Sequence, residues 1–399
     1  MTIADRLATI DVAELAVRIQ QIPAPTFAEH ERARFVERAF AERGLESVLV
    51  EHADDLPNVY ARVPGRDRAA PALVVSAHLD TVFPATTDLT VTRDPVERTI
   101  HGPGIGDNSL AVAALLALAE VYGRAPHDTE APAEAVVPTQ VEAPPCDIWL
   151  VANAGEEGLG NLRGIRAALG RLSEEAPGGI GCGVVLEGMA LGFVYHAGVG
   201  SRRYRLRVQA PGGHSWGDFG SSSAVHELVR RLRTIVDMDV PDSPRTTFNV
   251  GTVSGGTTIN TIASQAHAEI DLRSENAAEL DRLEARVRAA LRPGRDGDVD
   301  VVLELIGDRE AGSLDPEHPL VRGAIRALDE AGVPAQVRVG STDLNALLSA
   351  GVPGVCVGVS TGGRAHRLDE YINLDPLEQG LRQLGLLVPE AARIAAAGR

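Results

Sequence analysis

The residues most able to do chemistry lie in residues 72–82, which read A-L-V-V-S-A-H-L-D-T-V. The first half is apolar or small, which predicts a short buried strand of a parallel sheet. The strand ends at His78 and Asp80, which can share one face because side chains alternate along a strand. A neutral imidazole binds transition metals well, and a nearby carboxylate can orient it. Alone, His78 and Asp80 could equally be two hydrogen-bonded polar residues at the end of a strand. A metal site is therefore indicated only if further ligands occur at other strand ends.

Further polar clusters follow predicted strands or glycine turns, and each has a simpler alternative. Asp107, in G-P-G-I-G-D-N, could cap the apolar helix that is predicted over residues 108–124. Glu156 and Glu157, in N-A-G-E-E-G-L-G, could belong to a solvated loop. We therefore do not assign chemistry to either cluster by itself.

Glu187 and His366 complete the set of candidate ligands. Glu187 ends the apolar strand V-V-L-E, where an unpaired carboxylate is costly to bury, so a metal or an Arg partner is expected. His366 lies in the glycine-rich loop G-G-R-A-H, where a histidine is usually exposed. Together, two histidines and several carboxylates at one sheet edge match the nitrogen and oxygen ligands of a dinuclear zinc hydrolase. Such a site needs two cations ~3.5–4 Å apart, a bridging carboxylate, and one adjacent carboxylate that acts as a base.

Composition limits the class of protein. The chain has 399 residues, so two domains are expected. Its net charge of −17 disfavours nucleic-acid and anionic membrane surfaces. All 38 basic residues are Arg, which excludes catalysis by a lysine Schiff base and the lysine of a phosphate-binding loop. The three cysteines form no C-x-x-C pair, and we see neither a signal peptide nor a membrane-spanning run, so a cytoplasmic protein is expected.

The order of predicted elements gives the fold class. Strands alternate with helices up to Gly198, and the alternation returns near Pro319, which predicts an α/β domain with a central, mostly parallel sheet. Between them the order is βαββαβ, as in a ferredoxin-like unit. We therefore predict a discontinuous first domain at residues 1–199 and 311–399, with a second domain inserted at residues 200–310. Residues 125–146 hold five prolines and no periodicity, which predicts an exposed insertion.

These motifs, in this order, resemble the zinc amidohydrolase and exopeptidase family that includes acetylornithine deacetylase, succinyl-diaminopimelate desuccinylase, glutamate carboxypeptidase and aminotripeptidase. The resemblance covers nearly the whole chain, including the place of the inserted lid domain. It implies a bridging carboxylate at Asp107, a general base at Glu156 and an orienting acid at Asp80. It also implies that the remaining metal ligands are His78, Glu157, Glu187 and His366. In the family the bridging aspartate precedes a cis peptide, which predicts one between Asp107 and Asn108. The form G-D-N-S departs from the acidic or lysine-bearing forms of better-known members.

The resemblance extends to the lid. His214, in G-G-H-S, is similar to a histidine that reaches across a dimer interface and stabilises the oxyanion, although a loop histidine is the simpler reading. Asn260 and Arg273 are similar to groups that hold a substrate carboxylate, a role that suits the planar guanidinium. For Arg273 the alternative is an exposed strand-end charge. The S-T-D-L-N run at residues 341–345 is expected to line the pocket by the same resemblance.

The predicted function is therefore metal-dependent amide hydrolysis by a homodimer that holds two divalent ions per site, Zn²⁺ above Co²⁺ or Mn²⁺. Glutamate at position 187 resembles the deacylases and carboxypeptidases, which favours an N-acyl amino acid or a short peptide with a free carboxylate. One alternative is an aminopeptidase that acts on di- or tripeptides. An alternative of another class is a non-catalytic amino-acid or peptide-binding protein on the same scaffold.

Overall fold

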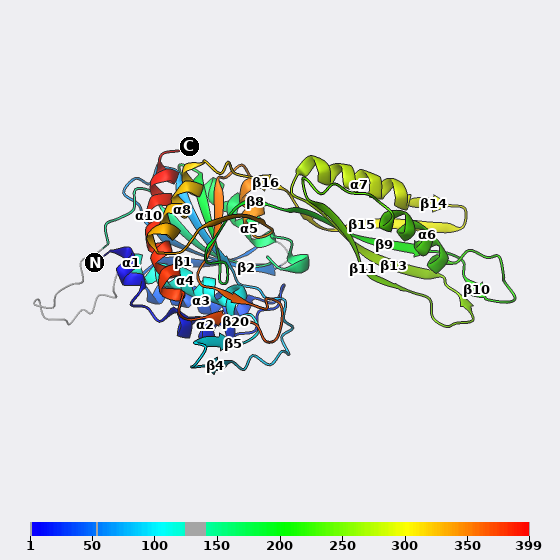
Figure 1. The fold of residues 1–399 in the computed structure, drawn as a ribbon, viewed down its shortest axis with the longest axis horizontal. Helices are drawn as coiled ribbons and strands as arrows, with labels where there is room; N and C mark the ends of the chain where they lie inside the picture. Colours follow the sequence, from blue (N-terminus) through cyan, green and yellow to red (C-terminus); the bar gives the residue numbers. More distant parts are fainter. Residues whose placement is uncertain (1, 53–54, 124–140, 399) are drawn as a thin grey trace, which may run out of the picture. The chain divides into compact units, whose positions relative to one another are not determined.

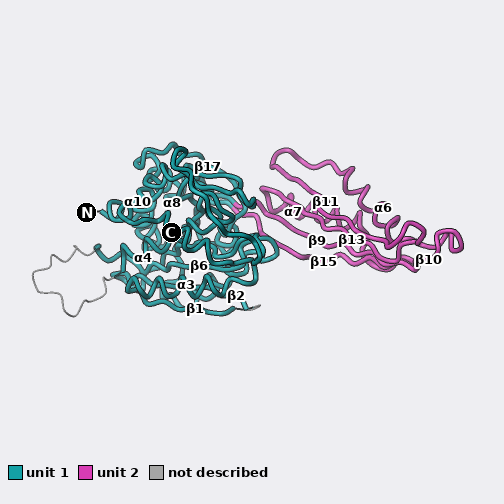
Figure 2. Tube along the Cα trace, turned by 90° about the horizontal axis from the view of Figure 1, so that it is seen from below, with its two compact units in different colours: residues 1–197, 313–399 teal, residues 198–312 magenta. Residues whose placement is uncertain are grey.

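The computed structural model describes residues 2–52, 55–123 and 141–398. The chain divides into two compact units, which Figure 2 shows in different colours: unit 1 comprises residues 1–197 and 313–399, and unit 2 comprises residues 198–312. The domain boundaries expected from the sequence, after residues 199 and 310, lie close to these. Each unit has its own buried hydrophobic cluster.

Unit 1 is built on a mixed β-sheet (Figure 1). Its strands, in spatial order, are β1 (Glu46–His52), β2 (Leu56–Val63), β6 (Ile148–Asn153), β3 (Ala72–His78), β7 (Ile180–Glu187), β18 (Gly354–Gly358), β8 (Phe193–Gly198) and β16 (Gly312–Ser313). The four central strands, β6, β3, β7 and β18, are mutually parallel, whereas the flanking pairs are antiparallel. The strand β17 (Gln336–Gly340) pairs with β8. Because the central strands are parallel, their carboxyl ends lie at one edge of the sheet.

A second, smaller sheet lies in unit 1, with the order β19 (Gly362–Gly363), β20 (Tyr371–Asn373), β5 (Thr99–His101) and β4 (Thr92–Asp94). The pairing of β20 with β5 brings two distant parts of the chain together. These are the segments that carry Asp107 and His366.

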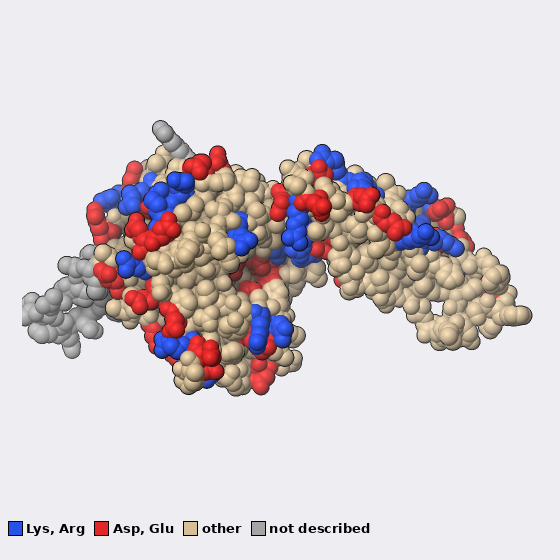
Figure 3. All heavy atoms as spheres, viewed as in Figure 1, with Lys and Arg blue, Asp and Glu red and all other residues tan. Residues whose placement is uncertain are grey.

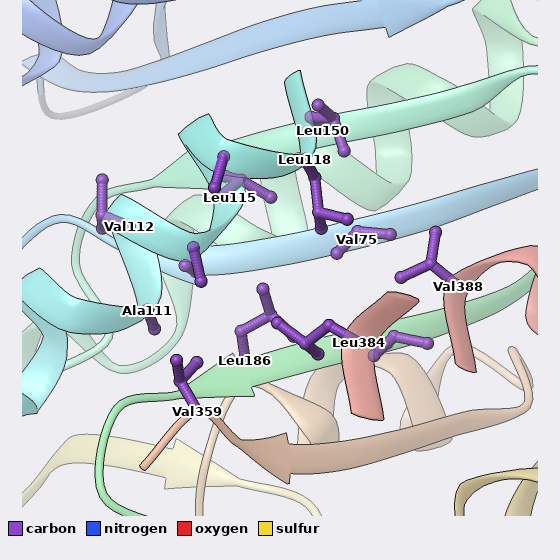
Figure 4. Close-up of a cluster of buried hydrophobic side chains, with 14 of the residues drawn as sticks. Val75, Ala111, Val112, Leu115, Leu118, Leu150, Leu186, Val359, Leu384 and Val388 are labelled. Atoms are coloured by element: carbon purple, nitrogen blue, oxygen red, sulfur yellow. The ribbon is translucent and has the colours of Figure 1, made fainter. Parts of the chain in front are cut away.

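Helices cover both faces of the large sheet. One face packs against α3 (His30–Glu42), α4 (Ala111–Tyr122) and α10 (Leu377–Ala396), and α8 (Pro319–Glu330) packs on α10. The other face packs against α5 (Arg163–Glu175) and α9 (Leu344–Ser349). Figure 4 shows leucines and valines from α4, α10 and the central strands meeting between them. Among the described residues, Ile105–Tyr122 is apolar and long enough to cross a membrane, but 83% of it is buried, as in the core helix of a globular fold.

Two predicted helices of unit 1 differ from the structure. The sequence of residues 4–21 predicts one amphipathic helix, but the structure has two, α1 (Ile3–Leu7) and α2 (Val12–Gln20). The expected helix breaks because the Asp11 side chain accepts the backbone N–H of Glu14 at 3.0 Å and so starts a new helix. The helix expected from Asn108 begins instead at Ala111.

The predicted insertion at residues 125–146 lies largely outside the described residues. Its last residues correct that prediction, because Pro144 and Cys146 are buried rather than exposed. The Cys146 thiol donates to the carbonyl of Ala392 in α10 at 3.3 Å, and the carbonyl of Pro144 accepts the N–H of Arg66 at 2.8 Å. The segment that leads into β6 is therefore part of the core packing.

Unit 2 is the predicted βαββαβ unit. It comprises β9 (Gly200–Gln209), α6 (Ala224–Val236), β11 (Thr246–Gly255), β13 (Gln265–Ser274), α7 (Ala277–Leu291) and β15 (Val299–Arg309). The sheet is antiparallel, with the order β11-β13-β9-β15-β14, where β14 is Gly294–Asp296. Both helices pack on one face of it. A short ribbon, β10 (Gly213–His214) with β12 (Thr261–Ile262), extends from one end (Figure 1). The predicted α/β fold class is confirmed, and the sheet of unit 1, expected to be mostly parallel, is mixed with four parallel strands at its centre.

Candidate metal centre

Three candidate ligands stand at the carboxyl edge of the central sheet. His78 is the last residue of β3 and Glu187 is the last residue of β7. His78 is level with Asn153, the last residue of β6, and Glu157 follows four residues later. Parallel pairing thus aligns the ends of three strands and gathers one imidazole and two carboxylates from segments far apart in the sequence.

Asp107 reaches the same edge from an irregular turn before α4. The N-cap position of α4 is Leu110 and no side chain of the described residues caps that helix, so the simpler alternative, that Asp107 caps it, is excluded. The peptide bond between Asp107 and Asn108 is cis, as predicted. The turn lies directly against the residue that follows Glu187, since a Cβ on Gly188 would stand 1.9 Å from the carbonyl oxygen of Gly106. Glycine at position 188 is what allows this close approach.

The two carboxylate oxygens of Asp107 face different histidines. Oδ1 lies 3.2 Å from His78 Nε2, and Oδ2 lies 3.3 Å from His366 Nε2. His78 Nε2 is also 3.9 Å from Glu187 Oε2, and His366 Nε2 is 3.0 Å from Glu157 Oε1. Two groups that could each hold a cation result, and they share Asp107: one is His78, Asp107 and Glu187, and the other is Asp107, Glu157 and His366.

Glu156 lies beside both groups. One of its oxygens, His78 and Glu157 offer ligand atoms within 4.8 Å of one another. The residue is 5% exposed. Its neighbour Glu157 belongs to the second group, so the two consecutive glutamates can take different roles at one site.

Asp80 holds the turn that carries these glutamates. Its Oδ1 accepts the backbone N–H of Glu156 at 2.9 Å, and its Oδ2 accepts that of Glu157 at 2.8 Å and the hydroxyl of Thr26 at 2.9 Å. Nδ1 of His78 lies 3.1 Å from the backbone carbonyl oxygen of Asp80 and 3.5 Å from Oδ1, which leaves Nε2 directed at the ligand groups. Asp80 is fully buried. It therefore contacts a histidine and a pair of glutamates at once, which is the arrangement expected of an orienting acid.

Proton affinities at the site reflect the crowding of carboxylates. Burial alone would lower the pKa of His78, but contacts with Asp107 and Asp80 and the charge of Glu187 raise it well above the usual value. Hydrogen bonds to Asp107 and Glu157 raise the pKa of His366 to about 10. Burial, together with the charges of Asp107 and Glu156, raises the pKa of Glu187 despite the opposing effect of His78. Burial opposes ionisation of Asp107, but its hydrogen bonds to His366 and His78 outweigh burial and lower its pKa.

These residues fit a pair of divalent cations. The donors are imidazole nitrogens and carboxylate oxygens, which suit Zn²⁺, Co²⁺ and Mn²⁺. Metal binding needs neutral imidazoles, so a bound cation would compete with the protons that the surrounding carboxylates favour on these histidines. The shared carboxylate of Asp107 suits the bridging position. The remaining ligands would be His78 and Glu187 for one cation, and Glu157 and His366 for the other.

The role of Asn108 at this edge was not predicted. Asn108 donates from Nδ2 to the carbonyl of Leu186 at 3.0 Å and accepts the N–H of Gly188 with Oδ1 at 2.9 Å. Its side chain therefore ties the Asp107 turn to the end of β7. No local pattern marks this role, because both partners lie about 80 residues away.

The S-T-D-L-N run also reaches the edge of the sheet. Asp343 Oδ2 accepts the side-chain N–H of Asn153 at 2.8 Å, and both residues are fully buried. The charge of Asp343 contributes to the raised pKa of Glu187. The run thus lies against the candidate centre.

Unit 2 carries the other predicted residues. Nδ1 of His214 accepts the backbone N–H groups of Trp216 and Gly217, each at 3.2 Å, so in a neutral ring the proton is on Nε2. Asn260 lies next to it, because its carbonyl accepts the N–H of Ser215 at 3.0 Å. Arg273 is in β13, where its Nε donates to Asp271 at 2.7 Å.

Arg273 is not near the other two within the unit. It lies eight residues along β13 from Gln265, at the strand end away from the β10–β12 ribbon. At ~3.3 Å per residue, that separation is roughly 26 Å. One copy of unit 2 therefore presents His214 and Asn260 at one place and Arg273 at another.

Known proteins resemble both units. Residues 197–297 match the family described as the M20 peptidase dimerisation domain. A curated protein of Sordaria macrospora, described as a peptidase M20 domain-containing protein, is 26% identical over 264 residues, which make up 61% of this chain and 53% of that protein. The match thus spans about half the length of that relative.

Solved structures match along nearly the whole chain. A tripeptidase of Staphylococcus aureus is 19% identical, with a TM-score of 0.73 and coverage of 98% of this chain and 100% of its own. The YxeP protein of Bacillus subtilis, described as a dinuclear metal-binding peptidase from the M20 family, is 15% identical, with a TM-score of 0.64 and coverage of 99% and 100%.

This chain resembles the M20 peptidases and amidohydrolases. The resemblance predicted from the sequence is thereby confirmed. The M20 fold extends over both units, and the dimerisation domain of that family corresponds to unit 2.

Proposed function

We propose that this protein is a metal-dependent hydrolase that cleaves an amide bond in an N-acyl amino acid or a short peptide with a free carboxylate. The observation that carries the proposal is the Asp107 carboxylate, whose two oxygens lie 3.2 and 3.3 Å from the imidazoles of two separate ligand groups. Two divalent cations, Zn²⁺ in our proposal, would polarise the substrate carbonyl and make an attacking water more acidic.

The residues of the chain supply the proton transfers. Glu156 accepts the proton of the attacking water and returns it to the leaving nitrogen. Asp80 holds Glu156 in place through the backbone hydrogen bond of 2.9 Å. His214 donates from Nε2 to the oxyanion of the tetrahedral intermediate, which suits the tautomer set by its Nδ1 contacts.

Substrate selection is assigned to Arg273 and Asn260. Side-chain exposure of 41% leaves the Arg273 guanidinium accessible beyond its bond to Asp271, and a guanidinium can bind a substrate carboxylate by two hydrogen bonds. Glu187, in the position that resembles the deacylases and carboxypeptidases, supports a substrate with a free carboxylate. The likeness to a tripeptidase supports cleavage of short peptides by an aminopeptidase as the second candidate.

Two copies of the chain form the active site in this proposal. Arg273 and His214 lie at opposite ends of one unit 2, so one substrate can meet both only if they come from different copies. The ribbon end that carries His214 also exposes large apolar side chains: Trp216 is 88% exposed, Phe219 90% and Ile259 103%. Figure 3 shows this end of unit 2 as largely uncharged. Exposed apolar clusters of this kind are typical of protein interfaces, and the match to a dimerisation domain supports a homodimer.

Replacing Glu156 by Ala tests the proposed base. A panel of N-acyl amino acids, dipeptides and tripeptides is first assayed with wild-type protein and added Zn²⁺. We expect Glu156→Ala to lower kcat by at least about 10³-fold, since it removes the proton carrier, while two cations per chain remain bound. Metal content is measured by elemental analysis. Wild-type-like turnover in the variant would refute the base assignment, and binding without turnover in the wild type would favour a binding protein.

A further inference from the structure

Glu370 is a buried carboxylate that the proposed mechanism does not use. None of its surface is exposed. Its Oε1 accepts the backbone N–H groups of Gly106 and Asp107, each at 2.8 Å. Its own carbonyl oxygen accepts the N–H of Gly102, also at 2.8 Å. Glu370 therefore accepts three backbone hydrogen bonds from the segment that ends at Asp107.

Glu370 also belongs to the segment that carries His366. Backbone hydrogen bonds of 3.1 Å close the turn, from Arg367 to Arg364 and from Glu370 to Arg367. The chain then continues directly into β20, which pairs with β5. Glu370 thus joins the segment of the shared ligand Asp107 to the segment of His366, although 263 residues separate it from Asp107 in the sequence.

A carboxylate is a costly choice for a purely structural link. Burial opposes its ionisation, and a neutral amide could accept the same N–H groups with less desolvation. The charged form makes stronger hydrogen bonds to N–H groups. It also lies beside a site where cations would offset its charge. The benefit of a carboxylate here is therefore expected when the ligands hold metal.

We propose that Glu370 is a positioning residue that sets the orientation of the Asp107 carboxylate between two cations and its distance from His366. Asp107 must serve two ligand groups at once, so a rotation of its backbone improves one contact only at the expense of the other. The hydrogen bond from the backbone N–H of Asp107 to Glu370 prevents that rotation. This inference rests on the metal centre of the proposed function and not on any substrate.

The test compares Glu370→Gln with Asp369→Asn. Both changes replace a carboxyl group by an amide at adjacent residues, but Asp369 is partly exposed and pairs with Arg364 and Arg367 instead of the Asp107 turn. Metal-free proteins are titrated with Zn²⁺ and with Co²⁺ by calorimetry. Because partners that orient ligands typically change metal affinity by 10–100-fold, we expect about that loss in Glu370→Gln, with a changed Co²⁺ absorption spectrum. Asp369→Asn should remain within about twofold of the wild type, as expected for a surface change.

Glu370→Asp guards against a variant that fails to fold. It keeps the charge but shortens the side chain, so it cannot reach both N–H groups at the observed distances. Native mass spectrometry counts cations on folded molecules only, and we expect a loss of metal affinity at least as large as that in Glu370→Gln. Wild-type affinity and spectrum in folded Glu370→Gln or Glu370→Asp would overturn the proposal.

The two proposals fail in different ways. A wild type that binds two cations but hydrolyses no amide refutes the proposed function and leaves the role of Glu370 intact. Equal metal affinity in the wild type and Glu370→Gln refutes the role of Glu370 and leaves the hydrolase proposal intact. A wild type that binds neither Zn²⁺ nor Co²⁺ overturns both.

Discussion

At the scale of single residues, the candidate centre depends on carboxylates with different tasks. Asp107 offers one oxygen to each of two ligand groups. Asp80 and Glu370 are fully buried and accept backbone N–H groups of the segments that carry ligands. Burying Asp80 and Glu370 costs desolvation free energy, but these two carboxylates hold the backbone of the segments that carry the ligands.

Glu29 is a further buried carboxylate, and it makes stability depend on pH. Burial, with a contribution from the charge of Asp80, raises its pKa to about 7 from 4.5, although N–H groups of Phe27 and Gly155 donate to it. A pKa that is raised in the folded state means that folding favours the protonated form. This favourable contribution is complete below pH 4.5 and is lost as the pH rises through about 7.

We therefore expect Glu29→Gln to gain stability relative to the wild type as the pH rises. At 1.36 kcal/mol per pKa unit, the difference in the free energy of unfolding should change by about 3 kcal/mol between pH 4.5 and pH 8. Urea unfolding of metal-free proteins at both pH values measures it. Glu42→Gln, at the exposed end of α3, the helix that Glu29 directly precedes, controls for general charge effects. A difference between Glu29→Gln and the wild type that is equal at both pH values would contradict the assignment.

At the scale of elements, close packing of helices on the sheet places the strand ends. In α10, a Cβ on Gly380 would lie 1.7 Å from the carbonyl oxygen of Val359, which follows β18. In α5, a Cβ on Gly170 would meet no atom within 4 Å. Glycine is therefore required for the close contact of α10 with the chain after β18, whereas the packing of α5 does not require glycine at position 170.

Gly380→Ala and Gly170→Ala should have opposite effects on stability. Alanine favours an exposed helix over glycine, so Gly170→Ala should raise the free energy of unfolding by about 0.5–1 kcal/mol. Gly380→Ala should lower it by at least about 2 kcal/mol, since α10 must move away from the end of β18. Thermal and urea unfolding measure both. Stabilisation by Gly380→Ala would show that α10 does not approach β18 in this way.

At the scale of the whole molecule, the chain consists of a unit with the candidate metal centre and a unit that matches a dimerisation domain. His214 and Arg273 occupy opposite ends of the second unit. A substrate that contacts both requires two copies of the chain, so activity should depend on the dimer.

Mixed dimers of His214→Ala and Glu156→Ala subunits should recover activity. Each variant alone should be nearly inactive, but a mixed dimer keeps one site with an intact Glu156 and an intact His214 from the other copy. Random mixing should restore about a quarter of the wild-type rate, because about half of the dimers are mixed and each has one intact site of two. The two variants are co-expressed with different tags, and the rate of hydrolysis is measured. No recovery in purified mixed dimers would place His214 in the same copy as Glu156.

The sequence by itself determined the types of ligand and the segments that hold them. The predicted strand at residues 72–78 has the bounds of β3, and the βαββαβ order of unit 2 was correct. Both are local properties, because burial sets the period of apolar residues along each element. The strands β1 and β8 and the break between α1 and α2 were missed.

Only the tertiary structure decided how the site is joined. It set which histidine each Asp107 oxygen faces, and it revealed the links through Asn108 and Glu370. It also separated Arg273 from His214 within unit 2. The contacts of Glu370 join residues 263 and 264 positions apart, and they depend on how helices and strands pack rather than on the residues that flank them in the chain.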